Sequence, residues 1–241
     1  MRVQVAALGL ATALSTLPPV FAHAASTVSF GVELGVVSRD IEEEGALLVG
    51  TGTGIADSTQ LTARLGVQVA PPVLLFGEFG VADITIDEFD QYRSDMHPLY
   101  GGGARLVLFE GAYPEHLTVY SDVRVVRLKT DDQVIVCLAS CGSSTPVEAL
   151  VDEEISWTEY GVGLGVRGRY EGYRPFGGFR VSRLDGTDRV GTVTADIRER
   201  EMVGFFLGTD IWLDRDERAA ITVQLSGIDE NALRVGYKVA F

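Results

Sequence analysis

The 241-residue sequence is poor in the residue types that build metal sites and nucleic-acid surfaces. It has three histidines and two cysteines, Cys137 and Cys141, and no histidine lies near that cysteine pair to complete a metal site. Its 20 lysines and arginines are outnumbered by 34 aspartates and glutamates, and a net charge of −14 would repel nucleic-acid phosphates. The same balance weighs against polybasic attachment to anionic lipid. We therefore expect no nucleic-acid partner, no metal and no cofactor.

Long apolar runs are also missing beyond the first residues. No segment after residue 24 approaches the roughly 20 apolar residues that a membrane-spanning helix requires. Residues 1–24 combine Arg2, a short apolar run, prolines and the small-x-small triplet Ala22-His-Ala24, which predicts a secretory signal peptide. Residues 25–241 are then one exported domain, in which two cysteines predict a disulfide between Cys137 and Cys141 at a loop tip.

The remaining sequence is dominated by apolar and polar residues that alternate with a period of two. No helical period persists over three turns, so the pattern predicts strands throughout. The expected strands lie near 27–39, 58–70, 73–86, 98–109, 117–130, 155–170, 173–184, 201–213, 218–227 and 232–241. Long polar connectors are expected at 40–57, 131–154 and 185–200, alternating with short turns. This predicts an all-β, transmembrane antiparallel up-and-down β-barrel of ten strands, with eight as the alternative.

The two faces of the expected strands differ in a way that favours lipid outside. One face is nearly free of charge, with aromatics near the strand ends, whereas the other is rich in glycine and suits a crowded interior. The interior face carries sparse charges of both signs that would form a lumen charge network: Glu33, Arg64, Glu78, Arg105, Asp122, Arg124, Glu159, Arg167, Arg180, Asp210, Arg234 and Lys238. Paired, these charges would fill the barrel; as a net-positive lining they would form a narrow pore.

The closing strand carries a further pattern, with Tyr237, Val239 and the terminal Phe241 on one face. With the signal peptide and the loop asymmetry, it makes the chain resemble the small bacterial outer-membrane β-barrels, which include the OmpA-like and OmpX-like barrels. The resemblance implies an outer-membrane location with periplasmic termini, surrounded by lipid and lipopolysaccharide. It also implies that the barrel-assembly machinery and periplasmic chaperones are partners, and that Tyr237, Val239 and Phe241 form a C-terminal assembly signal.

Catalytic patterns are weak. Ten strands are also similar to the omptin proteases, but their paired Asp-Asp and Asp-His sites are not found: Asp83 and Asp210 are isolated, and position 212 is Trp. Ser94, Asp95 and His97 supply hydrolase groups within one expected outer loop, while His116 falls at the other end of the barrel. Acidic clusters at 40–44, 83–95 and 152–154 fit solvated loops better than calcium sites.

The favoured function is therefore a non-enzymatic outer-membrane barrel with a filled polar lumen and a structural or surface-interaction role. A narrow pore for small solutes is the alternative, and an outer-membrane hydrolase is third.

Overall fold

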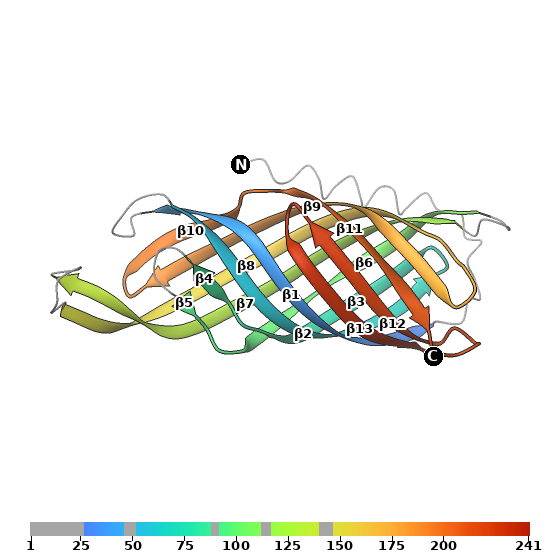
Figure 1. Ribbon diagram of the computed structural model, residues 1–241, viewed down its shortest axis with the longest axis horizontal. Helices are drawn as coiled ribbons and strands as arrows, with labels where there is room; N and C mark the ends of the chain where they lie inside the picture. Colours follow the sequence, from blue (N-terminus) through green and yellow to red (C-terminus); the bar gives the residue numbers. More distant parts are fainter. Residues whose placement is uncertain (1–26, 46–51, 88–91, 112–116, 140–146) are drawn as a thin grey trace.

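A single antiparallel sheet that closes on itself forms the protein in the computed structural model (Figure 1). The structure describes residues 27–45, 52–87, 92–111, 117–139 and 147–241, so the predicted signal peptide at 1–24 lies outside the described residues. The strands are β1 (Val28–Gly45), β2 (Gly52–Ala70), β3 (Val73–Ala82), β4 (Thr85–Asp87), β5 (Tyr92–Arg93), β6 (His97–Glu110), β7 (Thr118–Ala139), β8 (Val147–Arg167), β9 (Tyr173–Val190), β10 (Val193–Glu199), β11 (Val203–Trp212), β12 (Ala219–Gly227) and β13 (Asn231–Ala240). Within these ranges no helix is long and apolar enough to cross a membrane.

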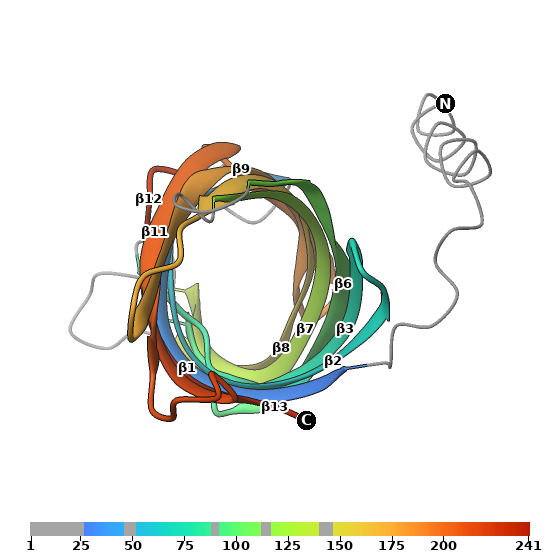
Figure 2. The same cartoon turned by 90° about the vertical axis from the view of Figure 1, so that its right-hand side faces the viewer.

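The pairing order confirms the predicted up-and-down barrel. Among the described residues, a ring of about ten strands runs β1-β2-β3-β6-β7-β8-β9-β11-β12-β13 and returns to β1, and Figure 2 shows it from one end. Closure comes from the β1–β13 ladder, which runs from Ser29 opposite Ala240 to Ser38 opposite Asn231. The start of β1 and the end of β13 therefore lie at the same end of the barrel, which we call the terminal end.

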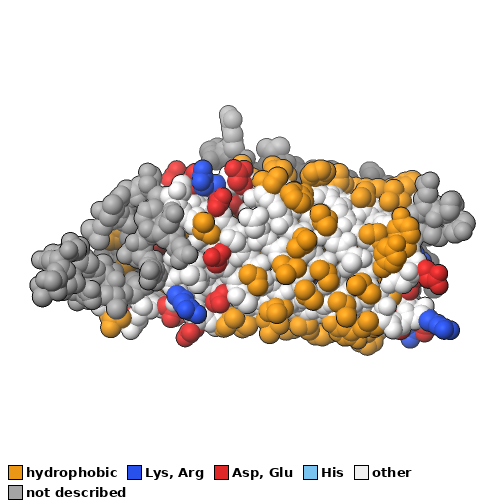
Figure 3. Space-filling model, in the orientation of Figure 1, with side chains coloured by type: hydrophobic (Ala, Val, Ile, Leu, Met, Phe, Trp, Pro, Cys, Tyr) orange, Lys and Arg blue, Asp and Glu red, His pale blue; other side chains and the backbone are white. Residues whose placement is uncertain are grey.

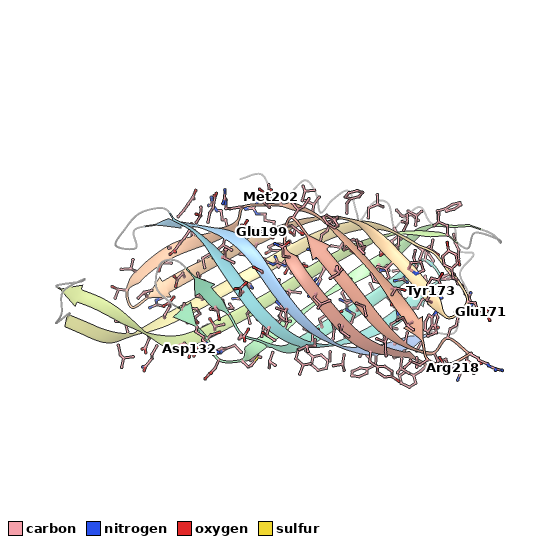
Figure 4. All side chains as sticks on the ribbon, viewed as in Figure 1. Asp132, Glu171, Tyr173, Glu199, Met202 and Arg218 are labelled. Carbon is pink, nitrogen blue, oxygen red and sulfur yellow. The ribbon has the colours of Figure 1, made fainter. Side chains whose placement is uncertain are left out.

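An apolar band surrounds the part of the barrel nearest the terminal end. On β1 the exposed side chains are Phe30, Val32, Leu34 and Val36, and on β8 they are Tyr160, Val162, Leu164 and Val166. In Figure 3 hydrophobic side chains gather over this part of the wall, and charged side chains begin where the band ends. In Figure 4 Met202 and Glu199 lie near one edge of this band and Tyr173 near the other, with Asp132 beyond the first edge and Glu171 and Arg218 near the second.

Beyond the band the same strands continue with their faces inverted. On β8 the outward side chains become Thr158, Ser156, Glu154 and Asp152, while Trp157 and Ile155 point inward and are buried. The inward apolar side chains form one core in what we call the outer half: Ile41, Ala56, Ala82, Ile84, Tyr92, Leu99, Val126, Leu128, Ile155, Trp157, Leu184 and Ile197. Strands with apolar residues inside and polar residues outside are those of a water-surrounded barrel.

This outer half corrects the predicted connectors. Residues 40–57, 131–154 and 185–200 are largely strand: β1 continues to Gly45, β7 and β8 pair along 118–139 and 147–167, and β9 continues to Val190 before β10 begins. The prediction was wrong because it took the charged residues of these segments for loop residues. In fact they mark strand positions exposed to water.

The β12–β13 hairpin ends much earlier than its neighbours and is covered by β10. Above the hairpin β10 pairs directly with β1, from Ile41 opposite Glu199 to Gly45 opposite Ala195, and also with β9. The hairpin turn lies beneath this crossing, where Asp229 and Glu230 are each 1% exposed. The preceding residue, Ile228, is 62% exposed and holds a positive φ of 80°, which is strained for a β-branched side chain. The turn therefore points its two carboxylates into the lumen.

Candidate functional site in the lumen

Glycines in the barrel wall let large inward side chains lie flat across the neighbouring strand. Tyr120 on β7 is the register partner of Gly165 on β8, and a Cβ at Gly165 would meet the Tyr120 ring at 2.6 Å. Phe76 lies across Gly103 in the same way, at 2.6 Å from a Cβ placed there. The glycine-rich interior face thus makes room for aromatic rings and for the arginines that stack on them.

An ion-pair network crosses the lumen between the apolar core and the terminal end. It runs from Arg64 and Glu78 through Arg124 and Glu159 to Arg39. Glu78 Oε2 accepts from Arg124 Nε at 2.7 Å, and Glu159 Oε2 lies 2.9 Å from Arg39 Nη2. Because these side chains come from β1, β2, β3, β7 and β8, the network ties opposite walls together.

On the other side of Arg39 the network ends on the buried hairpin turn. Arg39 Nη2 donates to Glu230 Oε2 at 2.6 Å, and Arg234 Nη1 donates to Glu230 Oε1 at 2.5 Å. Arg180 Nη2 lies 2.6 Å from Asp229 Oδ2 and 2.9 Å from Glu230 Oε1. Glu230 is therefore shared by three arginines, which compensates the cost of burying a carboxylate that is fully enclosed.

Glu199 also belongs to this network and lies outside the apolar band. It ends β10, whose outward neighbours Asp196 and Arg198 are exposed, and it accepts from Arg39 Nη1 at 3.2 Å and from Ser182 Oγ at 3.0 Å. In the described residues the network holds five arginines (39, 64, 124, 180, 234) and six carboxylates (33, 78, 159, 199, 229, 230). Burial raises the pKa of Glu199 to about 7, although Arg39 and Ser182 oppose the rise. A proton on Glu199 would balance the network's charge.

A cavity of about 360 Å³ lies on the terminal side of the network; we call it the vestibule. Its lining extends from Glu159 and Arg180 in mid-barrel to Ala240 and Arg218 at the terminal end. Two further ion pairs lie along it, Arg105 with Asp122 at 3.0 Å and Lys238 with Asp210 at 2.5 Å. Arg167 also lines it and has no ion pair in the described part of the chain.

The predicted lumen residues therefore divide into two groups. Seven of them, Glu33, Arg64, Glu78, Arg124, Glu159, Arg180 and Arg234, join the ion-pair network, while Arg105, Asp122, Arg167, Asp210 and Lys238 line the vestibule. Sequence reasoning missed Arg39, Glu199, Asp229 and Glu230. Arg39 continues the inward alternation of Glu33, Gly35 and Val37 and could have been found; the buried turn carboxylates gave no such signal.

The candidate hydrolase residues are not arranged as a catalytic set. The Ser94 hydroxyl is buried and accepts from the Ile84 backbone N–H at 2.8 Å. His97 instead lies 3.3 Å from Asp131 Oδ1 through Nδ1 and 3.3 Å from Asp132 Oδ2 through Nε2. Asp83 accepts from the Thr59 backbone N–H at 2.5 Å, and Asp210 lies in the vestibule. His116 lies outside the described residues.

The cysteine pair and the C-terminal pattern stay predictions. Cys137 belongs to β7, opposite Glu148, but Cys141 lies outside the described residues, so the predicted disulfide is untested. Tyr237, on the outer face of β13, is 46% exposed, and Phe241, directly after β13, is 78% exposed. Over the described ranges, no cluster of three or more His, Cys, Asp or Glu could hold a metal ion.

A comparison with solved structures shows which known proteins have a similar fold. The outer membrane protease OmpT from Escherichia coli superposes with a TM-score of 0.52 at 11% identity, over 89% of this chain and 97% of that one. The chain has the fold of the bacterial outer-membrane β-barrels. An outer membrane channel from Pseudomonas putida F1 also aligns, with a TM-score of 0.41 at 13% identity over 93% of this chain and all of that one. No protein-family model and no curated protein matches the sequence.

Proposed function

We propose that this protein is a non-enzymatic, non-conducting barrel of the bacterial outer membrane, with a structural or surface-interaction role. Its termini face the periplasm and its outer half projects beyond the lipid, so the outward polar side chains of β7, β8, β9 and β10 meet the external medium. The observation that carries the proposal is the filled lumen: an apolar core in the outer half stands directly above a buried ion-pair network.

The apolar core supports the closed lumen because it removes the hydrated path that an ion needs. Ile155 and Ile84 are fully buried, and Leu128, Ile197 and Leu184 are each 1% exposed. Four of them come from β7, β8, β9 and β10, and the same core includes Ile41 from β1, Ala56 from β2 and Leu99 from β6. A charged or polar solute that crosses this mainly apolar layer loses hydrogen bonds to water and gains few in return, which is unfavourable.

The ion-pair network is a second feature that supports a closed lumen. Breaking a buried ion pair leaves an uncompensated charge, so a solute cannot displace Arg39 or Glu230 without a large free-energy cost. The expected surroundings are outer-membrane lipid and lipopolysaccharide, and the barrel-assembly machinery and periplasmic chaperones are the proposed partners in biogenesis. Tyr237, Val239 and Phe241 are the proposed assembly signal.

Conductance across planar lipid bilayers tests the proposal. The refolded full barrel is expected to give no steady current steps. A double variant, Leu128→Ser with Ile155→Ser, weakens the apolar layer. A control pair, Leu164→Ser with Leu225→Ser, instead replaces two apolar side chains on the outward face with serine. Neither pair is expected to conduct while the Arg39 network remains. Reproducible steps from the unmodified barrel would overturn the proposal in favour of the small-solute pore.

A further inference from the structure

The vestibule holds three buried N–H donors that have no acceptor. Arg105 Nε, Arg167 Nε and Trp212 Nε1 are each buried without a hydrogen-bond partner among the described residues, and all three residues line this one cavity. Leaving such donors unpaired is unfavourable, so a cavity that gathers three of them is suited to a group rich in acceptors.

The same cavity carries uncompensated positive charge. In its terminal part the lining has four cations, Arg105, Arg167, Arg218 and Lys238, against the two carboxylates Asp122 and Asp210. Asp122 pairs with Arg105 and Asp210 with Lys238, which leaves Arg167 and Arg218 without an ion pair in the described ranges. Arg218 is exposed at the terminal end, so Arg167 is the unpaired charge that an anion would meet within the cavity, where electrostatic attraction is stronger than in water.

Aromatic rings complete the lining and give it an apolar component. The guanidinium carbons of Arg105 and Arg167 lie 4.4 and 5.3 Å from the centre of the Tyr120 ring, and that of Arg167 is also 5.7 Å from the Phe176 ring. Lys238 Nζ lies 5.5 Å from the centre of the Trp212 ring. Both guanidiniums are thus held against the Tyr120 ring, and since Arg105 also donates to Asp122, Arg167 is the one with no ion-pair partner in the described ranges.

We propose that the vestibule is a binding site for a small organic anion, one that joins a carboxylate or phosphate group to a planar apolar body. Arg167 is the principal donor, Arg105 and Trp212 offer further N–H groups, and the rings of Tyr120 and Phe176 contact the apolar part. A volume of about 360 Å³ is in the size range of small-molecule sites. The ligand enters from the terminal end, because the network and the apolar core close the other side. This site goes beyond the proposed function and does not depend on whether the lumen conducts.

Binding of benzoate to the refolded full barrel in zwitterionic detergent tests the site, with benzamide as the uncharged probe of the same shape. Titration calorimetry is one readout. Trp212 emission is the other, read in a Trp157→Phe background because Trp157, the second tryptophan, lies in the outer core. We expect saturable benzoate binding, weaker benzamide binding, and competition by inorganic phosphate.

Arg167→Gln is the decisive variant and Arg183→Gln is its matched control. Arg167→Gln removes the charge and is expected to weaken benzoate binding by about tenfold or more. Arg183 faces outward beyond the vestibule with a side chain that is 64% exposed, so its variant should bind benzoate as the unmodified barrel does. If a variant fails to fold, the benzoate and benzamide titrations of the unmodified barrel still test the proposal. The proposal is overturned if benzoate does not bind saturably, if benzamide binds equally well, or if both arginine variants bind alike.

Discussion

The two halves of this barrel are built from the same strands but bury opposite faces. Along β1 the outward side chains run from Phe30 to Val36 in the apolar band and then change to Ser38, Asp40 and Glu42, while Ile41 turns apolar inside. The alternation with a period of two continues where the outward side chains change from apolar to polar. The period alone therefore does not indicate whether lipid or water surrounds the wall. The chemical identity of the outward residues carries that information, and it places the edge of the band between Val36 and Ser38 on β1 and between Tyr160 and Thr158 on β8.

The lumen differs between the halves as well. In the outer half the interior is mainly apolar, with a few buried polar side chains such as Thr130 and Asp188, whereas the ion-pair network below it depends on every partner being present. The two halves should therefore respond differently to the same kind of substitution.

The largest expected effect comes from Arg39→Met. This change leaves Glu159, Glu199 and Glu230 without the guanidinium that all three contact. We expect the free energy of unfolding to fall by about 3–5 kcal/mol, measured by urea titration of the refolded barrel with heat-modifiable gel mobility.

Arg198→Met is the matched control for Arg39→Met. Arg198 Nη1 pairs with Glu44 Oε2 at 2.9 Å, but both side chains are more than half exposed. Exposed ion pairs contribute about 0–1 kcal/mol, so this variant should be nearly neutral. A loss of unfolding free energy from Arg39→Met that is as small as the loss from Arg198→Met would show that the network does not stabilise the barrel.

A second comparison uses two outward positions on β8. Leu164 is 53% exposed within the apolar band, and Ser156 faces outward in the outer half. Leu164→Lys is expected to cost about 2–4 kcal/mol in lipid vesicles, because a charge near the bilayer centre is poorly solvated. Ser156→Lys should change the free energy of unfolding by no more than about 0.5 kcal/mol. If the two variants are equally tolerated, the band does not meet lipid.

The smallest effect is a dependence on pH that belongs to Glu199. Its folded-state pKa of about 7 lies above the usual 4.5, so the folded protein holds this proton more tightly than the unfolded chain does. The contribution to stability is then present at low pH and declines as the pH rises through about 7, by up to about 3 kcal/mol.

Glu199→Gln isolates this contribution, because the amide stays neutral and its oxygen still accepts from Ser182. The difference in unfolding free energy between the variant and the unmodified barrel should grow between about pH 5 and pH 7.5 and then level off. A constant difference across that range would mean that Glu199 is already ionised at low pH.

The band half of the fold was predictable from sequence, and the outer half was not. Residues 160–166 carry apolar outward side chains at every second position, so both the existence of this part of the strand and its faces follow from the pattern. In residues 39–45 the only apolar inward residue near the end of β1 is Ile41, and three consecutive glutamates follow it. Such a segment forms a strand only because β2 and β10 pair with it, and single-segment patterns do not report that pairing.

The lumen charges were also predictable only in part. Inward charges on regular strands, such as Glu78 and Arg124, followed from their place in the alternation. Asp229 and Glu230 belong to a hairpin turn, where carboxylates are ordinarily solvated. Their burial depends on β10 crossing above the turn, which is a long-range feature of the barrel. The unpaired state of Arg167 likewise depends on which neighbours the closed ring brings near it.

The pairing of β10 with β1 also decides where molecules can enter or leave the lumen. A barrel that opens sideways into lipid does so by parting its first and last strands, which here would break the ten residue pairs between β1 and β13. In this protein β1 is held a second time, through five residue pairs with β10 and through the contact between Arg39 and Glu199. The closing ladder is thus fastened at its outer end by a strand that is not part of the hairpin. Exchange between the vestibule and the surroundings is left to the open end beside Arg218 and Ala240.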